Sequence, residues 1–197
     1  MTTRVVITGS GTPIPSADRA GPGVLLTSGD TAIQFDAGRS TVQRLAGAGL
    51  WPTDLDGLCL THHHSDHVTG LADVVLTRWV MDREEVLGPL PIAFPDGPLT
   101  GFVEDLLDPW ADDLEVRTAH SGHPPHPGVD ARPFEPTGGV ALSLGDLEVT
   151  AFAVCHEPVL PAVGKFSRCV SPVMRSFSRD SGSIPAFSPS PRMYSVT

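Results

Sequence analysis

Four side chains that can bind a transition metal follow one another closely near the middle of the chain. Residues 61–67 read THHHSDH, so that His62, His64, Asp66 and His67 form the pattern HxHxDH. Imidazole and carboxylate are ligand types that zinc prefers, and a tight turn brings such closely spaced donors together. Histidines two residues apart place both rings on one side of an extended segment. The pattern therefore predicts a zinc site, and the apolar segment before it argues against the alternative of an exposed polar loop.

The segments on either side of these histidines have the patterns of regular structure. Residues 55–60 (LDGLCL) are mostly apolar and predict a buried strand that ends directly before the histidines. In residues 68–81, four apolar side chains recur at helical spacing: Leu71, Val74, Val75 and Trp79. The metal-binding pattern is therefore expected in the turn between a strand and a helix.

Strands and helices are also expected towards the N-terminus. The apolar residues 5–7 predict a strand, and residues 23–27 and 31–35 predict a hairpin around the turn SGD. Residues 41–50 have apolar side chains at helical spacing, with Ser40 as the expected N-cap.

The second half of the chain has weaker patterns. Residues 88–139 are rich in proline and glycine, and only one helix is expected there, near residues 99–107. Residues 140–144 and 147–154 predict two strands around a Gly-Asp turn. Strands that alternate with helices indicate an α/β layered domain.

The motifs together resemble those of the metallo-β-lactamase superfamily, and within it the branch that contains ribonuclease Z and the metallo-type arylsulfatases. The resemblance covers about residues 4–164. It rests on four segments: GSGTPIPSADRAGPG (9–23), FDAG (35–38), THHHSDHVTGLADV (61–74) and VCHEPVLPAVG (154–164). It implies an αβ/βα sandwich, which we expect to be incomplete at the C-terminus.

The resemblance also implies a role for each site residue. The first zinc would be bound by three histidines: His62, His64 and His156. Asp66 and His67 would contribute to a second zinc, and Asp66 would also hold the attacking water. Asp36 would orient the histidine loop through hydrogen bonds, which fix ligand geometry. Zinc lowers the pKa of bound water and so supplies hydroxide at neutral pH.

The composition changes where the resemblance ends. Residues 165–197 contain nine serines and five basic residues against one carboxylate, Asp180, and the chain has no histidine after His156. We therefore expect a partial metallo-β-lactamase-like domain in residues 1–164 and an atypical, serine-rich basic tail in residues 165–197 that is disordered. The family supplies further ligands in this region. Asp180 is a weak candidate for a bridging ligand, and one zinc is expected to be well held beside an incomplete second site.

Two other features invite metal or redox chemistry. His120, His123 and His126 lie in the segment HSGHPPH, which is read as either an extra metal site or a solvated surface loop. The prolines favour the loop. Cys155 precedes His156, and because neighbouring residues of a strand point to opposite faces, we expect this cysteine to pack inside the protein.

Three functions fit the sequence. The first is a zinc-dependent hydrolase that cleaves a small phosphate, sulfate or carboxylic ester with a metal-bound hydroxide. The second is a ribonuclease Z-type endonuclease that processes the 3′ end of tRNA. Residues 82–148 hold fourteen acidic residues and three arginines, which disfavours tRNA because RNA binding needs cations that neutralise phosphates. The third is a catalytically impaired metal-binding remnant.

The sequence also bears on location and assembly. No apolar run approaches the roughly 20 residues that span a bilayer, and the N-terminal residues lack the pattern of a secretory signal. A cytoplasmic protein without a membrane partner is therefore expected. The resemblance leaves a homodimer open.

Overall fold

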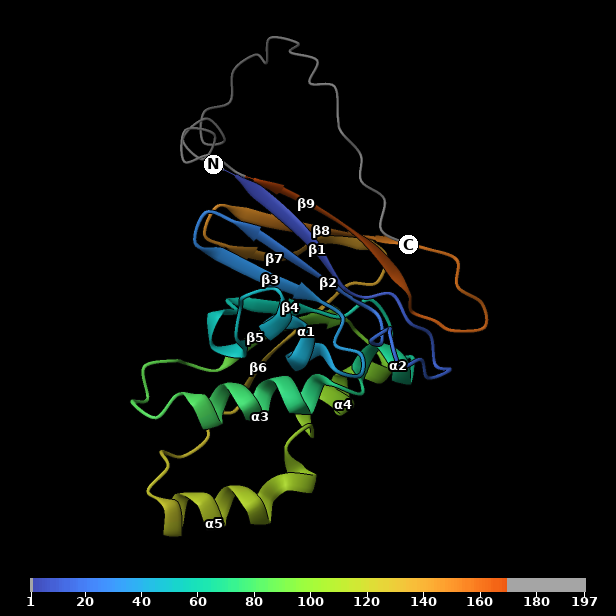
Figure 1. Ribbon diagram of the computed structural model, residues 1–197. Coiled ribbons are helices and arrows are strands. Elements are labelled where there is room, and N and C mark those ends of the chain that lie inside the picture. The colour runs from blue at the N-terminus through green and yellow to red at the C-terminus, as the bar shows by residue number, and fades with distance from the viewer. Residues whose placement is uncertain (1, 170–197) are drawn as a thin grey trace, which may run out of the picture.

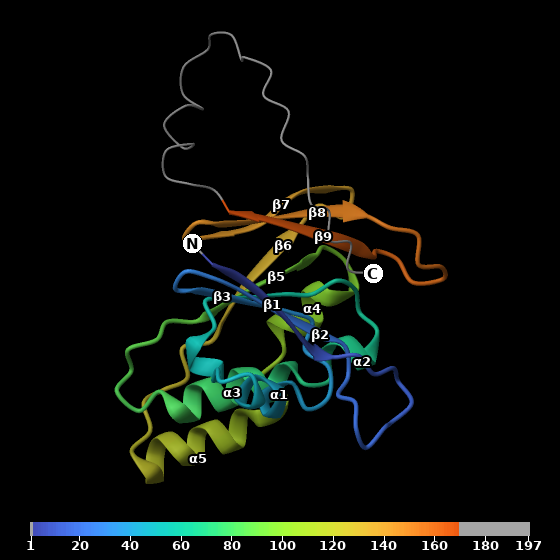
Figure 2. The same cartoon turned by 45° about the horizontal axis from the view of Figure 1, so that its top comes forward.

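The computed structural model describes residues 2–169, which form a layer of helices and two stacked β-sheets (Figures 1 and 2). Residue 1 and residues 170–197 lie outside the described residues, and with them Asp180 and most of the expected tail. No helix of the described part is long and apolar enough to cross a membrane.

The first sheet has six strands in sequence order. They are β1 (Thr3–Gly9), β2 (Gly23–Ser28), β3 (Thr31–Phe35), β4 (Gly57–Cys59), β5 (Leu90–Pro95) and β6 (Val129–Phe134). The first three strands are antiparallel, whereas β3 to β6 are parallel. Because parallel strands end at the same edge of a sheet, the residues that follow β3 and β4 lie next to each other.

The second sheet is antiparallel and lies over the first. It consists of β7 (Gly138–Leu144), β8 (Leu147–Ala153) and β9 (Val163–Cys169). Its inward-facing residues, among them Leu142, Leu147 and Val149, pack against Ile33 and Cys59 of the first sheet. This apolar contact is the core between the two sheets.

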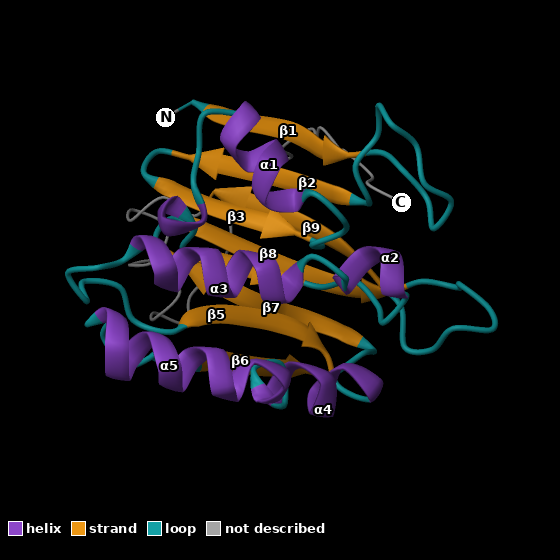
Figure 3. Ribbon diagram, turned by 60° about the horizontal axis from the view of Figure 1, so that its bottom comes forward, coloured by secondary structure: helices purple, strands orange, loops and turns teal. Residues whose placement is uncertain are grey.

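Helices cover the opposite face of the first sheet (Figure 3). They are α1 (Thr41–Gly47), α2 (Ser65–Val68), α3 (Leu71–Met81), α4 (Pro98–Glu104) and α5 (Ala111–Ser121), with short 3-10 turns η1 (Pro52–Asp54) and η2 (Asp108–Trp110). The core beneath them includes Leu58, Leu71, Val75 and Phe94. Leu58 therefore faces the helices while its neighbour Cys59 faces the other sheet, as alternation along a strand requires.

The structure confirms the predicted α/β class, the hairpin of β2 and β3, and the strand and helix on either side of the histidines. The helix expected over residues 68–81 begins at Leu71 as α3, and Val68 is the last residue of the separate short helix α2. The expected capping by Ser40 is wrong. Ser40 has a left-handed backbone and makes no capping bond, and the Thr41 hydroxyl donates to the Gly38 carbonyl instead.

One expectation for the second half is corrected. Residues 88–139 contain β5, α5 and β6 in addition to the expected helix. The strand β9 runs across the boundary expected after residue 164, and its pairing with β8 continues through Arg168 and Cys169. Polar residues can extend an antiparallel strand because backbone hydrogen bonds, which do not depend on side-chain type, hold it to its neighbour.

Gly38 packs against the backbone of α2. A Cβ atom at this position would lie 2.5 Å from the Asp66 carbonyl oxygen and 2.5 Å from the Gly21 carbonyl carbon. These are backbone atoms of two buried segments, so neither can yield without moving its segment. Glycine is therefore needed here for close approach.

We expect Gly38→Ala to lower the free energy of unfolding by about 1–3 kcal/mol, the usual cost of overpacking. Gly101→Ala is the matched control, because a Cβ at this exposed position of α4 meets nothing within 4 Å. The control should gain about 0.5–1 kcal/mol from its higher helix propensity. Urea unfolding measures both, and equal effects of the two variants would contradict the close packing at Gly38.

Candidate metal centre

The predicted ligands meet at one end of the sandwich, where the chain leaves three strands. Asp36 follows β3, and His62 and His64 follow β4. Asp66 and His67 lie in the short helix α2. His156 comes from the loop between β8 and β9 in the other sheet. Figure 1 shows this loop and α2 at the same end of the molecule.

Three histidines form a compact group. The Nε2 atom of His62 lies 3.0 Å from Nδ1 of His64, and Nε2 of His156 lies 3.3 Å from the same Nδ1 atom. The ligand atoms of the three residues all lie within 4.8 Å of one another. His62 is buried, His64 is half-buried and His156 is exposed, so the group opens towards solvent.

The 3.0 and 3.3 Å distances from Nδ1 of His64 to the other two nitrogens suit a tetrahedral zinc ion. With Zn–N bonds of about 2.0–2.1 Å, two nitrogens of a tetrahedral site are about 3.3 Å apart. Hydrogen bonds alone explain the group less well than a metal ion does. Nδ1 of His64 has room for one hydrogen-bond partner in the plane of its ring, but it faces two ring nitrogens. The residues therefore fit a metal ion that is held by three nitrogen lone pairs.

The protonation of His62 agrees with such a role. Burial, followed by the neighbouring charge of His67, lowers the pKa of His62 to about 4. The ring is therefore neutral at pH 7, and a neutral imidazole is the form that binds metals.

Asp36 organises the histidine loop. One oxygen of its buried carboxylate accepts the Thr61 N–H at 2.8 Å, and the other accepts Nδ1–H of His67 at 2.8 Å. The Thr61 hydroxyl lies 3.0 and 2.9 Å from the two oxygens. Asp36 itself has a φ of 54°, a left-handed conformation that aspartate tolerates better than most residues. Its amide donates to the Cys59 carbonyl, which fixes this turn to the end of β4.

These hydrogen bonds determine which nitrogen of the His62 and His67 rings keeps its lone pair for a metal. A carboxylate can only accept, so the Thr61 hydroxyl donates to Asp36 and its oxygen accepts from Nδ1–H of His62 at 2.9 Å. The Nε2 atom of His62 then keeps its lone pair and faces His64. In the same way, His67 donates from Nδ1 to Asp36 and keeps a lone pair on Nε2. Thr61 is the member of this network that the sequence interpretation missed, although it adjoins the motif.

Asp66 and His67 form a second, smaller pair of donors. The carboxylate of Asp66 is buried, and its Oδ2 lies 3.9 Å from Nε2 of His67. The rings of His62 and His67 are 4.1 Å apart between centroids, so this pair adjoins the three-histidine group. Burial lowers the pKa of His67, but its hydrogen bond with Asp36 and the charges of Asp36 and Asp66 outweigh burial and raise it.

His63 and Cys155 lie outside the ligand group. His63 is exposed, as the alternation of side chains along the motif requires. Cys155 is also exposed, so the expectation that it packs inside the protein is wrong. The strand β8 ends at Ala153, and the alternation of a strand does not extend to the loop beyond it.

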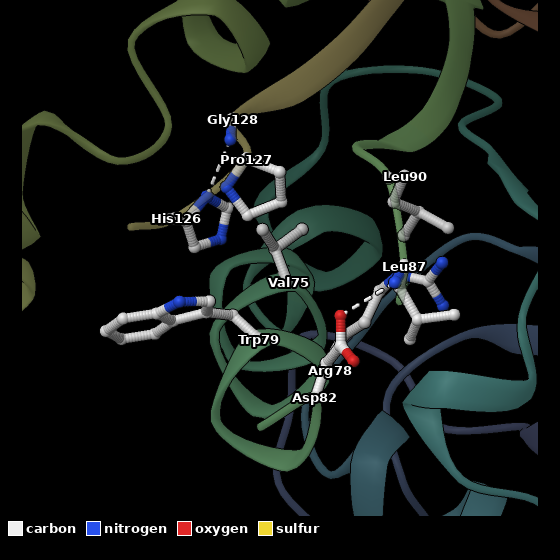
Figure 4. A pocket seen from close by; sticks show the side chains of 10 residues that line it. Val75, Arg78, Trp79, Asp82, Leu87, Leu90, His126, Pro127 and Gly128 are labelled. Atoms are coloured by element: carbon white, nitrogen blue, oxygen red, sulfur yellow. Dashed lines mark hydrogen bonds between the residues drawn. The ribbon is translucent and has the colours of Figure 1, made fainter. Parts of the chain in front are cut away.

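The segment HSGHPPH is only partly a surface loop. His120 is exposed at the end of α5, but His123 is buried, which corrects the solvated interpretation for that residue. The rings of His123 and His126 lie 4.7 and 5.5 Å from the Trp79 ring, and Trp79 donates its Nε1–H to the Pro124 carbonyl. Figure 4 shows His126 beside Trp79 in a small pocket that Val75, Arg78 and Leu90 also line. Among residues 2–169, the group around His62 is the one place where three such donors converge.

Comparison with known proteins connects this geometry to a family. Residues 3–87 match the family described as anti-Pycsar protein Apyc1. Ribonuclease Z of Mycolicibacterium gilvum is 37% identical over 163 residues, which cover 81% of this chain and 55% of that protein. Ribonuclease Z of Mycobacterium bovis is 36% identical over 164 residues and is covered to 56%. The chain thus spans a little over half the length of these relatives.

Solved structures show the same fold. The metallo-β-lactamase fold protein YhfI from Bacillus subtilis has a TM-score of 0.64 at 20% identity, over 84% of this chain and 58% of that one. The short form of human tRNase Z has a TM-score of 0.63 at 19% identity, over 85% of this chain and 65% of that one. The predicted metallo-β-lactamase fold is therefore confirmed.

His64→Ala should abolish tight zinc binding, because Nδ1 of His64 lies within 3.3 Å of both other ligand nitrogens. His63→Ala is the matched control, since its ring is exposed and is not part of the three-histidine group. Elemental analysis and zinc titration of the purified variants measure the difference. The unaltered chain should bind about one zinc tightly, and equal loss in both variants would contradict the assignment.

Asp36→Asn should weaken zinc binding by about 10- to 100-fold, the usual effect of removing a partner of a ligating histidine. An amide cannot accept from both Thr61 and His67 as the carboxylate does. Asp73→Asn serves as the control, because this exposed carboxylate of α3 accepts from the Thr77 hydroxyl and makes no other side-chain hydrogen bond within residues 2–169. Unchanged zinc affinity in Asp36→Asn would show that the network does not orient the ligands.

Proposed function

Because this chain belongs to the metallo-β-lactamase superfamily, in its ribonuclease Z branch, we propose that it carries the metal centre of a zinc-dependent ribonuclease that cleaves phosphodiester bonds in tRNA. The convergence of His62, His64 and His156 from two sheets is the observation that supports metal-dependent hydrolysis. The choice of RNA as substrate draws on the relatives, which are ribonucleases by name.

The residues of the site would have different roles in metal binding and catalysis. His62, His64 and His156 would hold a zinc ion, and Asp66 with His67 would offer two further donors beside it. A bound zinc ion would activate water and stabilise negative charge on the oxygens of the attacked phosphate group. Asp66 is a buried carboxylate next to the histidine group, so it can accept a hydrogen bond from the attacking water and orient it.

The acidic residues of the chain favoured a small-molecule substrate over tRNA, whereas the relatives favour RNA. Residues 82–148 hold fourteen acidic residues, but six of them lie between Glu104 and Glu115, in the segment that ends in α5. That helix lies at the outer edge of the helical layer, away from α2 (Figures 1 and 2). Repulsion of RNA by these carboxylates would therefore act mainly away from the metal centre, because salt screens charges beyond about 8–10 Å.

Several finer points remain predictions. They are one tightly bound zinc beside an incomplete second site, a cytoplasmic location, a possible homodimer, and the division of the chain between a partial domain and its tail. The small-ester substrate and the catalytically impaired remnant are alternatives that an activity measurement separates from the ribonuclease.

The zinc-loaded chain should cleave precursor tRNA, and Asp66→Asn should lower kcat by about 100-fold or more, the usual contribution of a positioned acid–base group. His63→Ala should retain full activity, since its ring is exposed and is not part of the three-histidine group. Cleavage is followed on denaturing gels, and bis(4-nitrophenyl) phosphate is assayed in parallel as a small phosphodiester. Hydrolysis of the small diester alone would favour a small-molecule hydrolase, and hydrolysis of neither substrate would favour the impaired remnant.

A further inference from the structure

Lys165 lies directly behind the histidine loop. It belongs to β9, and its Nζ donates a hydrogen bond of 2.6 Å to the Leu60 carbonyl. The ammonium group also lies 5.8 Å from the ring centroids of both Phe35 and Phe134. A lysine with its charge between two aromatic rings and one backbone carbonyl is held in a defined position.

The carbonyl that Lys165 contacts belongs to the segment that carries two ligands. Leu60 follows the last residue of β4 and precedes Thr61 and His62. Its amide donates to the Ala93 carbonyl of β5, and the next carbonyl, of Thr61, accepts the Val163 amide at 3.2 Å. Two consecutive carbonyls next to the histidines are therefore held by the start of β9.

The same strand determines where the third ligand lies. His156 lies in the loop that joins β8 to β9, and the Val154 amide donates to the Ala162 carbonyl across the base of this loop. The position of His156 relative to His62 and His64 consequently depends on how β9 is placed against residues 60 and 61. Among the described residues, the Val163 amide and the Lys165 ammonium make the hydrogen bonds that fix this placement.

Lys165 also occupies a costly environment. Burial lowers the pKa of its ammonium, and the nearby Cys59 and Asp36 partly offset this effect. A lysine that served only to fill space could be replaced by an apolar residue without this cost. The charge of Lys165 interacts with the Asp36 carboxylate, which accepts hydrogen bonds from Thr61 and His67.

We propose that Lys165 is a positioning residue of the metal centre, which aligns the strand after His156 with the segment before His62 so that the three histidines can share one ion. This role rests on the proposed zinc centre. It assigns a function to a residue that the sequence interpretation placed in a disordered tail.

Lys165→Met tests the proposal, because methionine keeps the apolar bulk but cannot donate to the Leu60 carbonyl. Zinc affinity of the full chain should fall by about 10-fold or more, as it does when other supports of a ligand are lost. Cobalt(II) binding provides a spectroscopic readout, since the intensity of its visible bands depends on tetrahedral geometry. Lys165→Arg keeps the charge and the donors and should recover most of the affinity.

Arg78→Met is the matched control for a purely structural effect. The Nη1 of Arg78 donates to three backbone carbonyls, those of Pro52, Thr53 and Leu55, which precede β4 at the end away from the histidines. Figure 4 shows Arg78 on α3. We expect this variant to lose stability in the metal-free state while its zinc affinity and cobalt spectrum stay unchanged.

The outcomes separate the two hypotheses. A loss of zinc affinity and an altered cobalt spectrum in Lys165→Met, with neither change in Arg78→Met, would support the positioning role. Unchanged affinity in a folded Lys165→Met variant would overturn that role and leave the metal centre intact. If Lys165→Met does not fold, Lys165→Leu removes the same donor with a shorter apolar side chain. Loss of zinc affinity in a folded Lys165→Leu variant supports the role, and unchanged affinity in it overturns the role. Failure of the unaltered chain to bind zinc would overturn the metal centre and the role of Lys165 together.

Discussion

The hydrogen bonds of the Asp36 carboxylate are the interaction on which the rest of the site depends. Its two oxygens hold the amide and hydroxyl of Thr61 and the Nδ1–H of His67. Through Thr61 the same carboxylate also determines the proton position of His62. One buried charge thus leaves a free lone pair on two separate rings, which would otherwise be free to adopt the wrong tautomer or orientation.

The fold explains how Asp36 reaches this loop. Strands β3 and β4 are parallel neighbours, so the turns that follow Phe35 and Cys59 meet at one edge of the sheet. The third histidine comes from the other sheet, which contacts the first mainly through apolar side chains. Apolar packing is non-directional, whereas hydrogen bonds also determine the relative orientation of the groups that they join. The polar contacts of Val163 and Lys165 supply that orientation.

The parts of the structure that the sequence predicted are those whose signal is local. The motif HxHxDH and the apolar segments around it are read from neighbouring residues, and Asp36 was identified from the segment FDAG (35–38), on which the family resemblance partly rests. The role of Lys165 could not be read in this way, because its partners Leu60 and Phe35 lie more than a hundred residues away along the chain. The burial of His123 was missed for a similar reason, since the Trp79 ring that lies against it belongs to α3, far earlier in the chain.

Burial of the histidines also links the stability of the metal-free protein to pH. The pKa of His62 falls from 6.5 to about 4 on folding, so between these values the unfolded chain binds more protons and stability decreases as the pH falls. His67 acts in the opposite sense. Its pKa is raised in the folded state, so its contribution is complete below pH 6.5 and is lost as the pH rises through the folded value. A metal bound by His62 competes with the proton that this ring would take up in acid. The neutral state that burial imposes on His62 is therefore the state that a metal requires, and the fold prepares this ligand before any ion binds.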